Sequence, residues 1–352
     1  MPCTGGCLKP RNPARPAPAI VVIGDINVDM LGRVKSWPKP GQDCLAPHLE
    51  MHLGGVGANS AMALARWGIG VRLAGCVGRD RFGDYVLEHL AQSGVDTSWV
   101  QRTADAMTGF FYINITRDGE RTFFGSRAAN GRVGRIRNVR ALCRGAAAAH
   151  LVGYNFLNPG PARAAKEITR EIHARGGWVS LDVGMAPSQQ IPGKILQLIS
   201  SVDILLLSAD EATLLTGARD PRAAFVRLQK AGARELILKL GKSGCLISQN
   251  GGPQHVPSFD VKMVDSTGAG DAFVAGFLQA RLRGWSLEEA AIAATAGGAA
   301  AVSFVGAGEK LPGSRAVASL LRSQRLRGKW DAVRRSALAR LQNRNSLPER
   351  HR

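Results

Sequence analysis

The chain has 352 residues, of which 45% are hydrophobic and 21% charged, and its formal net charge is +19. This length suits one large α/β domain with an elaboration, or two domains. No apolar run approaches the roughly 20 residues that a membrane-spanning helix needs. The six cysteines form no metal-ligand pattern and are expected to be free thiols. We therefore predict a globular, cytoplasmic protein with no membrane partner.

The basic charge is concentrated towards the two ends of the chain. Residues 313–352 hold 11 Lys and Arg against 2 Asp and Glu, and residues 1–19 add three basic residues. The first 19 residues also contain five prolines, so we expect them to form a disordered tail. A basic C-terminus can bind nucleic acid, but a solvated helix or a disordered end is the commoner outcome.

Strand and helix patterns alternate at the start of the chain. The apolar run Ile20–Ile23 predicts a buried strand. A helix over Asn59–Gly68, a strand over Val71–Val77 and a helix over Asp84–Ser93 are expected to follow. This order is typical of a parallel sheet with crossover helices.

A hairpin pattern then interrupts the alternation. Phe110–Thr116 and Arg121–Phe124 are rich in β-forming residues and flank an Asp-Gly pair, which favours a tight turn between two antiparallel strands. Such a hairpin fits poorly inside a doubly wound sheet. We expect it to form a small separate sheet, a lid, together with Leu31–Met51.

Alternation resumes after the hairpin. Strands are predicted at Ala148–Val152, Trp178–Asp182, Ile204–Leu207, Glu235–Leu240 and Gly244–Ser248, and helices at Pro161–Arg175, Asp210–Leu215, Asp271–Arg283 and Leu287–Val302. Val317–Leu341 is predicted to extend the C-terminus as one Arg-rich helix. Trp330, Val333, Ala337 and Leu341 fall on one side of that helix.

The most informative segment is Val264–Gly276, VDSTGAGDAFVAG. We expect a strand to end here, small residues to follow, and a helix to start at Asp271. Backbone N–H groups at such a helix start form an anion site, which suits a phosphoryl group in transfer. Asp271 would take the proton of an attacking hydroxyl, and the helix dipole is expected to lower the pKa of Asp271. The alternative is a tight turn with Asp271 as a helix cap.

Four motifs of this sequence resemble those of one family. DSTGAGDAF is similar to the C-terminal signature of the ribokinase-like (PfkB) carbohydrate kinases, and LGGVGANSA at Leu53–Ala61 to their GGxGxN segment. GDINVDM at Gly24–Met30 resembles the first substrate loop, and GRDRFG at Gly78–Gly83 the GxDxxG turn. The resemblance covers about residues 20 to 311. It implies a central, mostly parallel sheet with helices on both faces and a small β lid.

The resemblance also assigns roles at the reacting centre. Asp271 matches the catalytic base, and Gly268, Ala269 and Gly270 match the anion hole. The substrate-binding positions are matched by Asn27, Asp29, Gly54, Gly55 and Asn59. Val56 replaces the Lys of many ribose kinases, which weakens a ribose assignment. An Asx turn and a glycine turn with a helix cap are the structural alternatives for these two segments.

The resemblance further implies ATP and Mg²⁺ as cofactors. Ser208, Lys239, Gly241 and Gly244 match the nucleotide-binding positions, and Glu211 matches a residue that holds Mg²⁺, through water by its chemistry. Ser208 stands where the family has Asn. The alternative is that Ser208 and Glu211 form the capping box of a helix, and both readings can hold together.

The resemblance also implies a site for a monovalent cation such as K⁺, which some members of the family bind. Asp265, Thr267, Ala301, Phe304 and Gly306 match its loops, with simple loop packing as the alternative. Lesser candidates for contacts with the substrate are Arg121, Arg127, Asn130, Tyr154, Asn155 and Asp182.

These observations give a domain map and a hypothesis. A tail (1–19) precedes a kinase domain (20–312), whose lid comes from about 31–52 and 108–126, and a C-terminal helix with a basic tail (313–352) follows. The domain would transfer phosphate from ATP to a hydroxyl of a sugar or sugar acid. The alternatives are a nucleoside kinase, or a catalytically weak regulatory protein that binds nucleic acid through its basic tail. A homodimer formed through the lid is expected.

Overall fold

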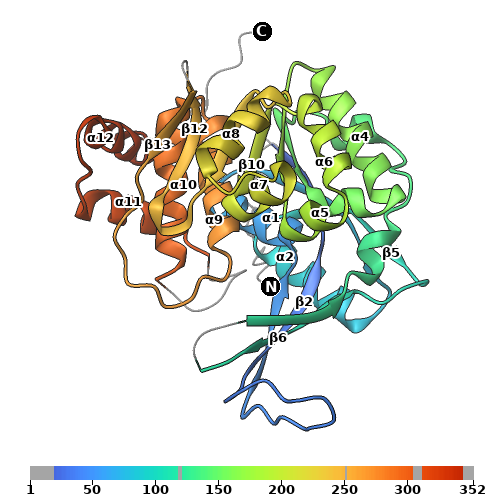
Figure 1. Cartoon of the computed structure of the whole chain (residues 1–352). Helices are drawn as coiled ribbons and strands as arrows, with labels where there is room; N and C mark the ends of the chain where they lie inside the picture. Colours follow the sequence, from blue (N-terminus) through green and yellow to red (C-terminus); the bar gives the residue numbers. More distant parts are fainter. Residues whose placement is uncertain (1–19, 118–120, 250–251, 304–310, 344–352) are drawn as a thin grey trace, which may run out of the picture.

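The computed structural model describes residues 20–117, 121–249, 252–303 and 311–343. The predicted N-terminal tail and the last nine residues lie outside these ranges. The described chain forms a large α/β body and a small sheet that projects from it (Figure 1). Among the described residues, no helix is both long and apolar enough to span a membrane.

The main sheet has nine strands in the order β13-β12-β11-β10-β9-β8-β1-β4-β5. Their bounds are β1 Ile20–Ile23, β4 Val71–Gly78, β5 Asp96–Thr103, β8 Ala148–Val152, β9 Trp178–Asp182, β10 Ile204–Ser208, β11 Glu235–Lys239, β12 Cys245–Gln249 and β13 Gly252–Val256. All neighbouring pairs are parallel except β11–β12 and β12–β13. Parallel neighbours require crossover connections, and helices form such connections here.

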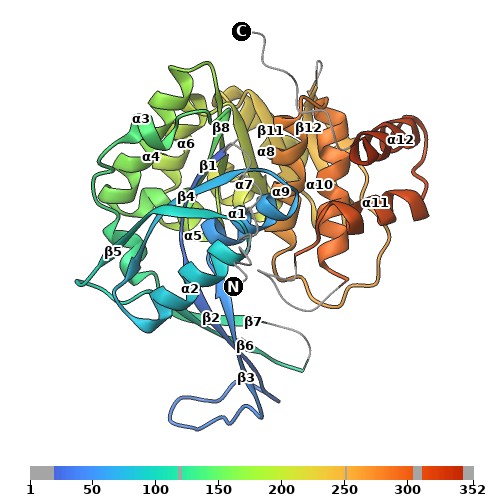
Figure 2. The ribbon, with the colours of Figure 1, turned by 180° about the vertical axis from the view of Figure 1, so that it is seen from behind.

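Helices cover both faces of this sheet, and each face has its own hydrophobic core. One core lies under α1 (Val56–Arg66), α2 (Arg81–Gln92), α9 (Ala269–Leu282) and α10 (Leu287–Ala301), and Figure 2 shows this side. The other lies under α4 (Pro159–His173), α6 (Pro192–Leu198), α7 (Ala209–Thr216) and α8 (Pro221–Lys230). Three shorter helices are α3 (Val139–Leu142), α5 (Met185–Gln190) and the 3-10 helix η1 (Ala128–Arg132). The predicted doubly covered α/β architecture is thus confirmed.

The predicted lid is a separate four-stranded sheet in the order β3-β2-β6-β7. Its strands are β2 (Asn27–Arg33), β3 (Leu49–Gly54), β6 (Gly109–Ile115) and β7 (Arg121–Ser126). The sequence prediction began this sheet at Leu31, whereas β2 begins at Asn27, so Asn27 and Asp29 lie on a strand and not in a loop. Side chains alternate along a strand, and Asp29, Phe111 and Gly125 are register partners on one face.

The C-terminal segment forms two helices where the sequence predicted one. α11 covers Ser314–Ser323 and α12 covers Lys329–Gln342. The chain turns between them, with Gly328 at φ +59°, a conformation that side chains disfavour. The predicted inner side of the second helix is confirmed, because Ala337 and Leu341 are buried and Trp330 and Val333 pack against the same core.

α12 is held against α10 by charged groups as well as by apolar contact. Arg340 pairs with Glu289 at 2.9 Å, and Lys329 pairs with Glu288 at 2.8 Å. Part of the basic charge of the C-terminus therefore neutralises acidic residues at the start of α10. The Lys329–Glu288 pair is largely exposed and adds little stability, whereas Glu289 is buried and also accepts from Ser336 Oγ at 2.6 Å. Apolar contacts of Ala337 and Leu341 add to this attachment.

Candidate active site

The GAGD segment forms the start of α9. No strand precedes it, and the helix begins at Ala269 with Gly268 as the N-terminal cap, two residues before the predicted start. Gly268 has φ +73°, which suits glycine. Asp271 is therefore the third residue of the helix. Its carboxylate therefore lies in the first turn of α9, at the end where the helix dipole is positive.

Several N–H groups at this helix start are available to a ligand. The amide of Ala269 donates to the carbonyl of Ser266 at 3.3 Å. The amides of Gly268, Gly270 and Asp271 donate to no acceptor among the described residues. A methyl group placed on Gly270 would meet no protein atom within 4 Å, so the space beside it is open. The turn thus offers donors to an anion, as its sequence suggests.

Asn59 lies directly beside Asp271, although 212 residues separate the two in the chain. Its amide nitrogen donates to Asp271 Oδ2 at 3.1 Å. Asn59 does not open α1 as predicted: the helix begins at Val56, which places Asn59 within its first turns. Its Oδ1 is buried and has no hydrogen-bond partner in the described structure. That oxygen can accept a hydrogen bond from a bound hydroxyl.

The electrostatic environment of Asp271 differs from the one we predicted. Burial, followed by repulsion from Asp182, raises the pKa of Asp271 from its ordinary value of 3.8 to about 7. The Asn59 hydrogen bond and the Lys239 ammonium oppose this shift without cancelling it. The prediction that the helix dipole would lower this pKa was therefore wrong, because loss of hydration dominates.

Asp29 and Asn27 lie on β2 at the base of the lid. Asn27 Oδ1 already accepts from Asn130 Nδ2 at 2.7 Å, so this side chain is partly satisfied by the protein. The carboxylate of Asp29 makes no hydrogen bond or ion pair within the described residues. Burial raises the pKa of Asp29 to about 7. Of the two, Asp29 retains more capacity to accept from substrate hydroxyls.

At Gly54 and Gly55 the backbone lies so close to neighbouring groups that no side chain fits. A methyl group on Gly54 would collide with the Asp29 carboxylate. Gly55 has φ +91°, and a methyl group there would collide with the carbonyl of Asp25. These two glycines therefore keep Asp29 close to the start of α1, where Asn59 lies.

A cluster of charged groups lies at the ends of β9, β10 and β11. Lys239 Nζ donates to Asp182 Oδ1 at 2.8 Å. Burial alone would lower the pKa of Lys239, but the charges of Asp182 and Glu211 outweigh it and raise that pKa. Burial raises the pKa of Glu211, repulsion from Asp182 adds to this, and Lys239 opposes it. Two carboxylates thus share one cation beside Asp271.

Ser208 and Glu211 form the capping box that the sequence offered as an alternative. Glu211 N–H donates to Ser208 Oγ at 3.2 Å, and Ser208 N–H donates to Glu211 Oε2 at 2.8 Å. One oxygen of Glu211 is therefore committed to the start of α7. The other remains for a cation or for water.

The segment from Lys239 to Gly244 forms the predicted turn after a strand. Gly241–Ser243 is a single 3-10 turn, and Gly244 has φ +90°. A methyl group on Gly244 would collide with the carbonyl of Val256. The turn is placed at the same sheet edge as Ser208 and Glu211, because β10 and β11 are parallel neighbours.

The positions matched to a monovalent cation are only partly described, since Phe304 and Gly306 lie outside the described residues. Asp265 accepts from the Thr267 amide at 2.9 Å and from Thr267 Oγ1 at 2.6 Å. Ala301 is the last residue of α10. Arg121 of the lid contacts Ser266 and Thr267 and lies 3.8 Å from Asp265. The lid therefore touches the loop that leads into α9.

One ion pair near the site could not be predicted from any motif. Arg127 pairs with both oxygens of Asp25, at 2.6 and 2.8 Å, and also donates to Asn158 Oδ1 and to the carbonyl of Tyr154. Asp25 and Arg127 are 102 residues apart. This buried pair joins the end of β1 to the end of the lid. Arg127 and Tyr154 were only lesser candidates, and Asp25 lies in the Gly24–Met30 motif but was given no role there.

A cavity of about 1010 Å³ opens beneath the lid. Phe111 and Phe123 line it from the lid, Arg127 and Tyr154 from the sheet edge, and Met185 from α5. Asp271, Asn59 and the residues of the GAGD turn do not line it. It can hold a part of a ligand that extends away from the reacting centre.

A doubly covered, mostly parallel sheet, a β lid, and a helix start at which unpaired amides lie beside a carboxylate together fit a class of phosphate-transferring enzymes. The family comparison agrees: the chain matches the model of the pfkB family carbohydrate kinases over residues 17–313. It belongs to this family and is a carbohydrate kinase.

Curated relatives align along most of this chain. It is 29% identical to the ribokinase of Haemophilus influenzae, over 83% of this chain and 95% of the relative. It is 28% identical to the 2-dehydro-3-deoxygluconokinase of Thermoproteus tenax, over 91% and 99%. It is 31% identical to the aminoimidazole riboside kinase of Salmonella typhimurium, over 83% and 91%.

Solved structures share the fold. The ribokinase of Arabidopsis thaliana, complexed with ribose and ATP, superposes with a TM-score of 0.76 at 27% identity, covering 86% of this chain and 98% of that one. An Escherichia coli chain described as ribokinase II, in complex with ATP and Mg²⁺, gives a TM-score of 0.74 at 25% identity, covering 87% and 100%.

Proposed function

We propose that this protein transfers the γ-phosphoryl group of Mg·ATP to a hydroxyl of a sugar or sugar acid, with Asp271 as the base. The observation that carries the proposal is the placement of Asp271 beside unpaired amides at the start of α9. The hydroxyl oxygen attacks the γ-phosphorus while its proton passes to Asp271. The bond from γ-phosphorus to the bridging oxygen breaks, and ADP leaves.

The substrate would be oriented by the groups that the protein leaves unsatisfied. The Asp29 carboxylate and Asn59 Oδ1 are acceptors without partners among the described residues. Both would accept from hydroxyls of the sugar, while Gly54 and Gly55 allow the close approach. The amides of Gly268 and Gly270 would bind the equatorial oxygens of the transferring group. Closure of the lid would exclude water and prevent simple hydrolysis of ATP.

ATP and Mg²⁺ would occupy the edge formed by Ser208, Glu211 and the turn from Lys239 to Gly244. Within the described residues, no three Asp, Glu, His or Cys side chains come together as metal ligands. Mg²⁺ would therefore take most of its ligands from water and phosphate. The repulsion between Glu211 and Asp182 suits a nearby cation. When bound, the ion supplies charge neutralisation on the phosphates. A K⁺ ion near Asp265 remains part of this proposal.

A nucleoside kinase is the second candidate, and the cavity beneath the lid favours it. Its aromatic residues, Phe111, Phe123 and Tyr154, offer faces on which a planar base can stack. A volume of about 1010 Å³ exceeds what a free pentose fills. The sugar would still occupy the same position beside Asp271, so both candidates share one mechanism.

An ADP-release screen with Mg·ATP tests the proposal. The acceptors are ribose, fructose, 2-dehydro-3-deoxygluconate, fructose phosphates and adenosine, each with wild type and Asp271→Asn. We expect acceptor-dependent turnover with one class, and a loss of about 10²–10⁴-fold in Asp271→Asn, as for removal of a general base. Turnover that survives in Asp271→Asn would refute the assignment of the base. Turnover only with adenosine would select the nucleoside candidate.

A further inference from the structure

The net positive charge of residues 20–312 comes from one stretch of sequence. Residues 132–175 contain 9 Lys and Arg against 2 Asp and Glu. The rest of the body, residues 20–131 and 176–312, contains 23 of each sign. The excess charge therefore does not spread over the surface. It collects on α4 and on the segment that leads from η1 through α3.

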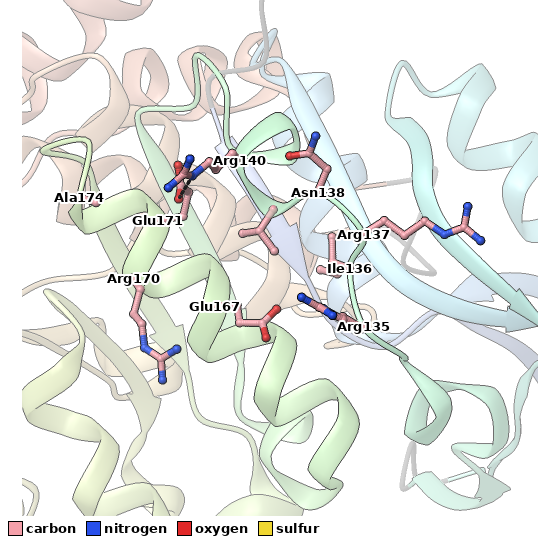
Figure 3. A pocket seen from close by; sticks show the side chains of 10 residues that line it. Arg135, Ile136, Arg137, Asn138, Arg140, Glu167, Arg170, Glu171 and Ala174 are labelled. Atoms are coloured by element: carbon pink, nitrogen blue, oxygen red, sulfur yellow. Dashed lines mark ion pairs between the residues drawn. The ribbon is translucent and has the colours of Figure 1, made fainter.

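This stretch forms a cavity of about 470 Å³ on the flank of α4 (Figure 3). Arg135 and Glu167 face one another at one end, and Arg140 and Glu171 lie together at the other. Ile136, which is buried, lines the cavity near Arg135. A second cavity of about 340 Å³ continues along α4 and shares Glu167 and Arg170 with the first. Arg163, Lys166 and Lys194 line this continuation.

The guanidinium groups of this cavity are largely unused by the protein. Arg135, Arg137 and Arg170 form no ion pair or side-chain hydrogen bond within the described residues. Arg140 lies 3.9 Å from Glu171, and its side chain is 87% exposed, so that pair is loose. The tight pair of Glu171 is with Arg175 at 2.5 Å. Arg135 and Arg170 are thus free to bind an external anion.

The cavity is separate from the catalytic centre. α4 starts at Pro159, beside Asn158, which contacts the buried Arg127 at the active-site edge. The helix then runs away from that edge. Residues from its second half and its C-terminal cap, Glu167 to Ala174, line the 470 Å³ cavity. None of the proposed catalytic, nucleotide-binding or substrate-binding residues lines either cavity.

We propose that this cavity is a second binding site for a small phosphorylated sugar. The guanidinium of Arg135 or of Arg170, which lie on opposite sides of Glu167, would bind the phosphate by donating two parallel hydrogen bonds to its oxygens. Glu167 lies between them and would accept from sugar hydroxyls. A ligand that carries both groups matches this alternation of guanidinium and carboxylate, because its hydroxyls donate to Glu167 and compensate the repulsion that inorganic phosphate would meet there.

A nucleic-acid strand fits the same surface less well. Neither cavity has an aromatic residue among its lining residues, so bases would find no platform for stacking. Glu167 and Glu171 would also lie against a continuous phosphate backbone and repel it. The alternating signs therefore favour a compact ligand over a polyanion.

Isothermal titration calorimetry at low salt tests the proposal, with glucose 6-phosphate, inorganic phosphate and a short oligothymidylate as probes. We expect glucose 6-phosphate to bind wild type. Arg135→Ala/Arg170→Ala should weaken that binding on the order of tenfold for each charged contact removed. Arg315→Ala, on the surface of α11, removes an equally exposed arginine elsewhere and should change nothing. Asp29→Ala, which removes a proposed contact with the substrate in the active site, should also retain the binding, and this separates the two sites.

A second variant tests the role of the carboxylate. Glu167→Ala should weaken glucose 6-phosphate but strengthen inorganic phosphate, because it removes an acceptor and a repulsive charge together. The proposal is overturned if wild type does not bind glucose 6-phosphate, or if the double variant binds it unchanged. It is equally overturned if oligothymidylate alone binds in an arginine-dependent manner, since the surface would then serve nucleic acid. None of these readouts requires kinase turnover.

Discussion

At the scale of single residues, the site depends on carboxylates that the fold surrounds but leaves partly exposed. Asp271 and Asp29 both have a pKa raised to about 7 by burial. A raised pKa makes an ionised carboxylate a stronger base, so burial increases the basicity on which the proposed proton transfer depends. For Asp271, the hydrogen bond from the Asn59 amide and the charge of the Lys239 ammonium act in the opposite direction and lower the pKa.

The pH dependence of activity should report this balance. The base must be ionised, so we expect kcat/KM to rise with pH through about 7 and then to level off. Lys239→Met removes a charge that favours the ionised form, and should move this rise to higher pH. Lys239→Arg keeps the charge and serves as the control. A profile that is flat through neutral pH would contradict the assignment.

The same shift predicts a trade between stability and activity. The pKa of Asp271 rises from 3.8 to about 7 on folding, so this group favours the folded state less as pH increases from about 4 to about 7. Asp271→Asn has no ionisable group at this position, so it does not lose folding stability in this way as the pH rises. Its melting temperature should exceed that of wild type at pH above 7, and the difference should vanish in acid. Thermal unfolding of both proteins across this pH range checks the prediction.

At the scale of elements, the sequence predicted best those strands and helices with a clear apolar pattern. β8, β9, β10 and β11 are buried apolar runs and were found nearly to their ends. β5 and β13 were missed because they are the two edge strands, half-exposed and without an apolar run. The starts of α1 and α9 were placed too late, since glycines there hide the first turns.

The residues of the candidate site also divide into those that a local sequence pattern reveals and those that it does not. The GAGD turn, Asn59 and the Ser208–Glu211 box carry local spacing that a sequence reveals. The Asp25–Arg127 pair and the Asp182–Lys239 pair join residues 102 and 57 positions apart, so no local pattern could show them. What the sequence omits here is the set of partners that only folding brings together.

The capping box of α7 allows its structural and functional roles to be separated. Ser208→Ala removes the acceptor for the Glu211 amide and should cost about 1 kcal/mol of unfolding free energy. Ser208→Asn retains a capping oxygen and restores the amide that the family carries, so it should keep stability and lower the KM for ATP. Chemical denaturation and ATP kinetics of both variants decide this. Equal ATP kinetics in all three proteins would make Ser208 a cap alone.

At the scale of the whole molecule, the outer face of the lid has no cover within the described residues. Leu49, Met51 and Phe124 are exposed there to 56%, 40% and 77%. Apolar groups gathered on one face favour association, and a second copy of this chain offers the same face. We expect a homodimer in sedimentation equilibrium, converted to a monomer by Phe124→Lys. A wild-type monomer at every concentration would contradict this.

The lid also separates what can change from what cannot. The groups proposed to carry the chemistry lie at the edge of the closely packed body and on the base of the lid, where Gly54, Gly55 and Gly244 have no room for a side chain. Phe123, which lines the cavity beneath the lid, is 57% exposed. Substitutions there disturb no core, so new acceptors can be selected by altering the lid alone. The fold is therefore suited to laboratory evolution of substrate range without redesign of the catalytic machinery.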